Sequence, residues 1–128
     1  MKLLLDSGPF LWMILGDPRL SARARDLVID PDNELLLSVV SAWEISIKSS
    51  LGRLPLPDPP ARFITTQRQI HAIQSLPLEE EPALYWNRLP RIHTDPFDRM
   101  LICQAIVHGL ALLTPDEWIA KYPVRVLW

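Results

Sequence analysis

Short runs of aliphatic residues alternate along this chain with segments in which apolar residues recur at helical spacing. Residues 2–5, 34–37 and 110–113 form such runs, and helical segments lie between each run and the next. This alternation predicts parallel strands joined by right-handed crossovers, and so an α/β fold with a central, mostly parallel sheet and helices on both faces. With 128 residues and 48% hydrophobic content, the chain suits one domain over residues 1–128 and leaves no room for a second.

Capping residues and helix breakers predict the remaining boundaries. Ser38 or Ser41 should cap a helix that runs to Leu51, and the prolines between residues 54 and 60 predict an extended connection. We expect the first helix only at 10–15, because Ser7-Gly8-Pro9 interrupts the chain after the first strand. The other expected helices are 22–29, 61–71, 79–88, 96–108 and 116–121, with short strands at 73–76 and 124–128.

Charge and hydropathy exclude several classes of protein. A net charge of −2 and a pI near 5.9 exclude a globally basic surface, so any contact with a polyanion needs a local basic patch. The N-terminus is too short in apolar residues for a signal peptide, and no window reaches the roughly 18 uninterrupted apolar residues of a membrane span. The one cysteine, Cys103, cannot form an internal disulfide. We therefore expect a cytoplasmic protein with no membrane association.

Four carboxylates lie where such a sheet would bring them together. Asp6 directly follows a predicted strand, and Asp116 comes shortly after another. Asp98 lies at the start of a predicted helix, and Glu44 lies within one. Ligand sites of parallel sheets form at the carboxyl ends of the strands, beside a switch in strand order. Acids crowded there repel one another unless a cation compensates them, and oxygen ligands suit a hard divalent ion, which indicates Mg²⁺ or Mn²⁺ chemistry.

Each of these acids also has an ordinary structural role. Asp6 and Asp116 suit turns, and Asp98 occupies the first turn of a helix that Asp95 would cap. Glu44 could pair with Lys48 one turn later, which contributes only about 0.2–0.5 kcal/mol. Taken singly, Asp6 and Asp98 favour the structural role, and Asp116 stands at even odds. Their joint placement at one edge of the sheet is what indicates a functional site.

Glu44 differs from an ordinary surface acid in its place on the helix. At about 100° per residue it lies at the margin of an apolar stripe. A carboxylate there should be partly desolvated and needs a partner. The predicted stripe consists of Val39, Val40, Trp43, Ile47 and Leu51.

Other kinds of site have little support in the sequence. His71, His93 and His108 share neither a helical face nor a ligand spacing, so we predict that all three are non-catalytic. The chain has no glycine-rich phosphate-binding loop, so we do not expect an α/β domain that binds a nucleotide cofactor. Its five tryptophans lie in apolar periodic segments, so we expect them in the core or in partner interfaces rather than stacked on nucleic-acid bases.

Four segments, in this order and spacing, carry a resemblance to a known family. They are Leu3-Leu4-Leu5-Asp6-Ser7, Ser41-Ala42-Trp43-Glu44-Ile45, Asp95-Pro96-Phe97-Asp98-Arg99 with Met100-Leu101-Ile102, and Leu112-Leu113-Thr114-Pro115-Asp116. From end to end the chain resembles the PIN-domain ribonucleases, specifically the VapC-type toxins of toxin–antitoxin pairs. It departs from the commonest pattern at Gly8-Pro9, which affects the local turn and not the acids.

The resemblance implies a PIN-like fold and a metal-dependent endoribonuclease. Asp6, Glu44 and Asp98 would be the catalytic acids that bind Mg²⁺ or Mn²⁺, Asp116 would be the fourth and more variable position, and Ser7 would be the usual hydroxyl. The substrate would be single-stranded or looped RNA, with tRNA and rRNA both open. A cognate VapB-type antitoxin and a homodimer are implied as partners.

Two other functions remain open on the sequence. The first is a non-catalytic α/β interaction module whose acids are only structural caps. The second, a phosphoacceptor signalling domain, ranks well below because it needs a paired acid beside Asp6 and a late lysine that the chain does not convincingly supply. If the protein is a nuclease, the cations that flank the acidic segments could guide RNA phosphates, although solvated surface charge is the more ordinary role for each. These cations are Lys48, Arg53, Arg91 and Arg99.

Overall fold

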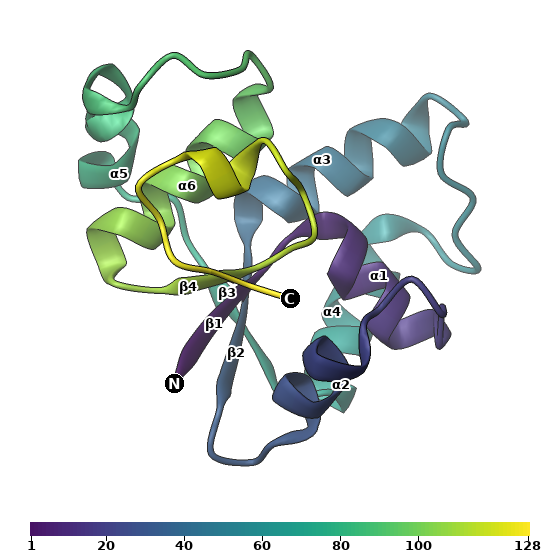
Figure 1. Ribbon diagram of the computed structural model, residues 1–128. Coiled ribbons are helices and arrows are strands. Elements are labelled where there is room, and N and C mark those ends of the chain that lie inside the picture. Colours follow the sequence, from purple (N-terminus) through teal and green to yellow (C-terminus); the bar gives the residue numbers. More distant parts are fainter.

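The computed structural model describes residues 1–128 and contains one five-stranded sheet between two layers of helices (Figure 1). The sheet order is β3-β2-β1-β4-β5, and every adjacent pair is parallel. The predicted α/β fold is confirmed, with a sheet that is parallel throughout. The strands are β1 (Lys2–Leu5), β2 (Glu34–Ser38), β3 (Ile73–Leu76), β4 (Ala111–Leu113) and β5 (Val126–Leu127).

Six α-helices connect and cover these strands. Most begin and end within a residue or two of the expected positions, and Ser38 caps the third. None of them is both long enough and apolar enough to cross a membrane. The helices are α1 (Ser7–Leu15), α2 (Ala22–Ile29), α3 (Val39–Ser50), α4 (Pro60–Ile70), α5 (Glu80–Tyr85) and α6 (Pro96–His108), with short 3₁₀ turns η1 (Trp86–Arg88) and η2 (Ile119–Lys121).

Two boundaries differ from the expectation for physical reasons. Helix α1 begins at Ser7 rather than at residue 10, because the Asp6 side chain accepts a hydrogen bond from Ser7 N and the proline falls in the first turn, where a missing N–H costs nothing. The expected helix at 116–121 is only a turn followed by the 3₁₀ turn η2.

Successive strand residues point into two separate cores. Leu3 and Leu5 pack on the side covered by α1, α2 and α4, whereas Leu4 packs on the side covered by α6. All three leucines have no solvent exposure, and each such side chain contributes about 1.5–3 kcal/mol of hydrophobic burial. Because both faces of β1 are covered, the strand is uniformly apolar rather than alternating.

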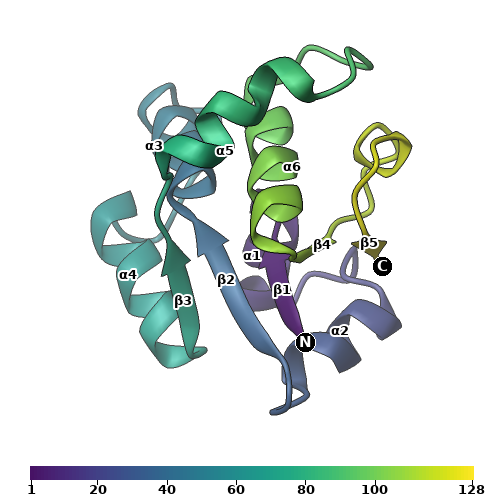
Figure 2. The same ribbon diagram turned by 90° about the vertical axis from the view of Figure 1, so that its left-hand side faces the viewer.

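The strand order reverses at the centre of the sheet. From β1 the chain builds outward through β2 to β3, and then returns to the other side of β1 for β4 and β5. The carboxyl ends of β1, β2 and β3 point to the same edge, and α6 begins at that edge (Figure 2). A crevice at such a switch point is where α/β sheets bind ligands. Here the switch in strand order lies between β1 and β4.

Candidate functional site

Asp6 lies at the switch point, directly after β1. Its backbone N–H donates to Leu113 O of β4 at 3.3 Å. Its Oδ1 accepts from Ser7 N at 2.8 Å, and its Oδ2 accepts from Thr114 Oγ1 at 2.9 Å. Burial raises the pKa of Asp6, these two hydrogen bonds lower it, and the carboxylates of Glu44 and Asp116 raise it further. The ionised form is therefore costly at this position without a cation.

Glu44 reaches the same edge from α3, which follows β2. Its side chain is buried, and its Oε1 accepts a hydrogen bond of 2.6 Å from the Ser7 hydroxyl. Lys48 Nζ lies 3.1 Å from Oε2. The expected desolvation of Glu44 is confirmed, and the ion pair with Lys48 that the sequence allowed as its ordinary structural role is present as well. Because Asp6 accepts from Ser7 N and Glu44 from Ser7 Oγ, this one serine links two of the four acids.

The predicted apolar stripe of α3 is wrong. The buried residues of the helix are Val40, Ser41, Glu44 and Ile45, so Glu44 lies within the buried face rather than at its margin. Trp43 is 62% exposed and packs edge-to-face on Phe97 of α6, with ring centroids 5.3 Å apart. Burying the polar face is tolerated because Glu44 has hydrogen-bonding and charged partners there.

Asp98 lies in the first turn of α6. The expected cap is confirmed, since Asp95 accepts a hydrogen bond from Asp98 N at 3.0 Å. Burial raises the pKa of Asp98 to about 7, with repulsion from Asp6, Asp95 and Asp116 adding to it and a hydrogen bond to His93 opposing it. That bond joins Asp98 Oδ2 to His93 Nε2 at 3.0 Å.

Asp116 has the turn contacts that its sequence position suggested. Its Oδ1 accepts from the backbone N–H groups of Trp118 at 2.8 Å and Ile119 at 3.3 Å. Its own N–H donates to Thr114 Oγ1 at 3.2 Å, and the same hydroxyl donates to Asp6. Thr114 therefore links Asp116 to Asp6 as Ser7 links Glu44 to Asp6.

Ser7 and Thr114 thus join Glu44, Asp6 and Asp116 at one edge, and Asp98 lies close enough for repulsion from Asp6 and Asp116 to raise its pKa. As the side chains stand, no three carboxylate, histidine or cysteine groups are close enough together to hold a metal ion. The donor chemistry nevertheless fits a hard divalent cation, because the ligands on offer are carboxylate oxygens and burial raises the pKa of two of them, Asp6 and Asp98. Holding such an ion would require side-chain movements that bring the oxygens together.

Three residues surround Asp98 in a way that the sequence did not indicate. His93 was predicted to be non-catalytic, yet it contacts Asp98 directly. Tyr122 and Arg99 are both buried behind it. Arg99 Nη1 donates to Pro90 O at 2.8 Å and to the Tyr122 hydroxyl at 3.1 Å, so Arg99 is not the solvated surface charge that its sequence position suggested as the more ordinary role. The spacing of His93 to Asp98 was the one available signal, since a loop residue five positions before a helix-start acid can fold back onto it.

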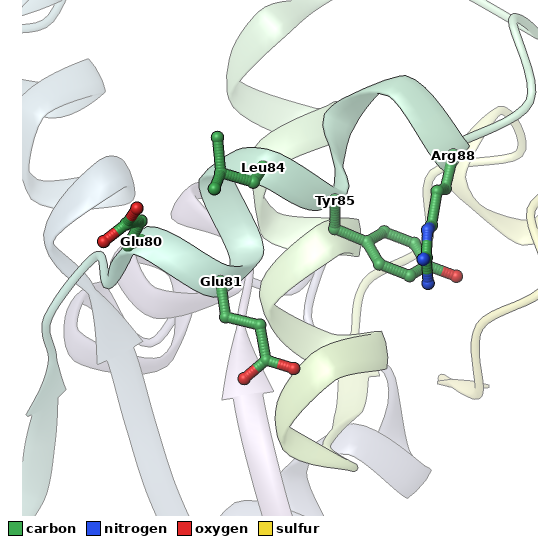
Figure 3. A pocket seen from close by; sticks show the side chains of 5 residues that line it. All are labelled: Glu80, Glu81, Leu84, Tyr85 and Arg88. Atoms are coloured by element: carbon green, nitrogen blue, oxygen red, sulfur yellow. The ribbon is translucent and has the colours of Figure 1, made fainter.

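Two surface cavities lie on the part of the chain between β3 and α6. One of about 490 Å³ runs along α5 and η1 and contains none of the four acids; its Tyr85 and Arg88 side chains lie next to each other (Figure 3). The other, of about 280 Å³, is lined by cationic and aromatic side chains that include Trp86, Arg91 and His93. Only the second adjoins Asp98, through His93.

Comparison with known sequences gives a family and one partial relative. The sequence matches the PIN domain over residues 3–124. Ribonuclease VapC16 of Mycobacterium tuberculosis is 49% identical over 51 residues, which is 37% of this chain and 36% of that protein. That alignment therefore spans little more than a third of the relative's length.

Solved structures match over nearly the whole chain. The VapBC2 complex of Rickettsia felis, bound to a DNA fragment from its promoter, aligns with a TM-score of 0.74 and 13% identity over 99% of this chain and 98% of the other. VapBC-5 of Mycobacterium tuberculosis aligns with a TM-score of 0.61 and 20% identity over 98% and 95%. At these identities the matches show a shared fold. Taken with the family match from Leu3 to Val124, they place this protein in the PIN-domain family, where it is similar to VapC-type members.

Proposed function

We propose that this protein is a VapC-type toxin: a metal-dependent endoribonuclease that hydrolyses phosphodiester bonds in single-stranded or looped RNA. The observation that carries the proposal is that Asp6, Glu44, Asp98 and Asp116 lie near one another at the switch point of a parallel sheet, where burial and neighbouring carboxylates raise the pKa of Asp6 and of Asp98. The partial relative named as a ribonuclease agrees with this.

The four acids would hold Mg²⁺, with Mn²⁺ as the alternative ion. A divalent ion bound there would lower the pKa of a bound water and neutralise charge on the phosphate. The chain's own contribution is orientation. Ser7 and Thr114 fix Glu44 and Asp6 through hydroxyl donors, and Lys48 supplies positive charge beside Glu44 until a metal ion replaces it.

We also propose a VapB-type antitoxin and a homodimer as partners. Structural neighbours that were solved as VapBC complexes support the antitoxin, whereas the homodimer rests on the family resemblance alone. The surface beside the site carries exposed aromatic side chains, Trp43 and Trp118, of the kind enriched in protein interfaces.

The test is cleavage of an RNA pool by purified protein freed of any partner. Cleavage should require Mg²⁺ or Mn²⁺, stop with chelator, and be lost in Asp6→Asn and Asp98→Asn. Asp58→Asn is the matched control, because this exposed acid lies in the proline-rich connection, outside the site. Cleavage that persists in both site variants would refute a catalytic role of these acids. Inactivity of the wild type on diverse RNAs would favour the non-catalytic interaction module.

A further inference from the structure

A buried series of hydrogen bonds links Arg99 to Asp98. Arg99 Nη1 donates to the Tyr122 hydroxyl at 3.1 Å. That hydroxyl lies 2.7 Å from His93 Nδ1, and His93 Nε2 lies 3.0 Å from Asp98 Oδ2. Asp98 Oδ1 has no hydrogen-bond partner within the protein. This series of hydrogen bonds therefore ends at Oδ2 of a proposed metal ligand, Asp98, and leaves its Oδ1 without a hydrogen-bond partner.

The hydrogen bonds of Tyr122 determine which nitrogen of His93 carries the proton. A tyrosine hydroxyl has one hydrogen and two lone pairs. Both lone pairs are used, because the hydroxyl accepts from Arg99 Nη1 and, at 3.1 Å, from the backbone N–H of His93. Its hydrogen is therefore directed to Nδ1 at 2.7 Å, in preference to His93 O at 3.4 Å. With Nδ1 accepting, the proton of the neutral ring is on Nε2, where it is donated to Asp98.

The packing around His93 opposes any other orientation of the ring. Its side chain is only 12% exposed. It lies parallel to the Trp118 ring at 6.1 Å and edge-on to Tyr122 at 5.3 Å. Arg99, at the other end of this series of hydrogen bonds, is also held in place. Its guanidinium lies over the Trp86 ring at 4.6 Å and donates to Pro90 O.

We propose that His93 is a positioning residue: Tyr122 and Arg99 hold it in the Nε2-protonated form, and its hydrogen bond to Oδ2 fixes the Asp98 carboxylate with Oδ1 directed to a divalent cation. The inference rests on the proposed function, in which Asp98 is a metal ligand. Hydrogen-bonded partners behind a ligand set its orientation, and their removal commonly weakens metal binding by about 10–100-fold. Arg99 takes part because its fixed positive charge makes the Tyr122 hydroxyl a stronger donor.

The first test needs no substitution. Long-range ¹H–¹⁵N correlation spectra of the histidine rings in the metal-free wild type distinguish the two neutral tautomers. The His93 ring, assigned by its loss in His93→Gln, should show a protonated Nε2 and an unprotonated Nδ1. A ring protonated on Nδ1 would overturn the inference.

The second test compares metal binding in His93→Phe and His93→Gln by calorimetric titration with Mn²⁺. Phenylalanine keeps the ring and removes the donor, so the dissociation constant should rise about 10–100-fold. Glutamine places an amide N–H near the position of Nε2 and should restore most of the affinity. His71→Phe, the same change in the residue that ends α4, should bind as the wild type does.

The outcomes separate this inference from the proposed function. Equal binding by the wild type and His93→Phe overturns the positioning role alone. Equal losses in His93→Phe and His93→Gln also overturn it, because a merely structural role would not distinguish the two variants. A wild type that binds no divalent ion overturns the proposed function as well. If His93→Phe does not fold, the tautomer spectrum and the His93→Gln titration still decide the question.

Discussion

Asp98→Asn should make the metal-free protein more stable at pH 8. The pKa of Asp98 is about 7 in the folded protein against an ordinary value of 3.8, so the folded state holds the proton more tightly than the unfolded chain. The stability linked to this proton is fully present below pH 3.8 and is lost as the pH rises to about 7. Above pH 7 the wild type therefore carries an ionised carboxylate that the fold disfavours, and asparagine removes that charge.

The pKa difference limits the size of the effect. A pKa raised from 3.8 to about 7 corresponds to at most about 4 kcal/mol. The Asp98 side chain keeps 15% exposure, and solvent screening reduces the figure, so we expect a gain of about 1–2 kcal/mol. Asparagine can still accept the hydrogen bond from His93 through its amide oxygen. Most of the gain should therefore survive.

Urea denaturation with chelator present, at pH 4.5 and at pH 8, measures this gain. The variant should be more stable at pH 8, and the difference should shrink towards zero at pH 4.5. Added Mg²⁺ should then stabilise the wild type more than the variant, because only the wild type has the full ligand set. A variant that is less stable at pH 8, or equally changed at both pH values, would refute the electrostatic reasoning.

Substitutions at three further positions test other parts of the structure. Thr114→Val removes the donor to Asp6 Oδ2, so the pKa of Asp6 should rise further and Mn²⁺ binding at pH 7 should weaken; unchanged calorimetric titration would count against the site. Leu4→Ala should lower the free energy of unfolding by about 2–5 kcal/mol in urea, since Leu4 has no exposure, and a loss below 1 kcal/mol would mean that the core is misassigned. Ser21→Ala should cost about 1 kcal/mol in the same assay, because its hydroxyl caps α2 through Ala24 N, whereas Ser21→Asp should cost little.

The sheet was predictable because its signals are local. The leucine runs at 3–5 and 35–37 need only their own apolarity to be recognised as buried strands, and alternation with helices then implies parallel pairing. The edge strand Ile73–Leu76 was also found, although two of its four residues are exposed. The acids followed from the strand ends, because a parallel sheet brings those ends to one edge.

What the sequence did not predict depends on contacts between distant segments. His93 meets Tyr122, 29 positions later, and Thr114 meets Asp6 across 108 positions. The hydrophobic periodicity of the sequence does not predict contacts between residues so far apart. The buried face of α3 was misassigned for a related reason: a helical stripe is found by apolarity, and here the hydrogen-bonding partners of Glu44 allow a polar face to be buried while Trp43 lies outside.

The edge-to-face pair of Trp43 and Phe97 has a consequence for the interior. Each ring belongs to the residue directly before a proposed ligand, Glu44 on α3 and Asp98 on α6. The two helices are in contact, and this aromatic clasp joins them on their outer side. The residues next to Glu44 and Asp98 therefore share a contact that solvent reaches, since Trp43 is largely exposed. A protein that covered Trp43 would touch the backbone segments that carry both acids without entering the site.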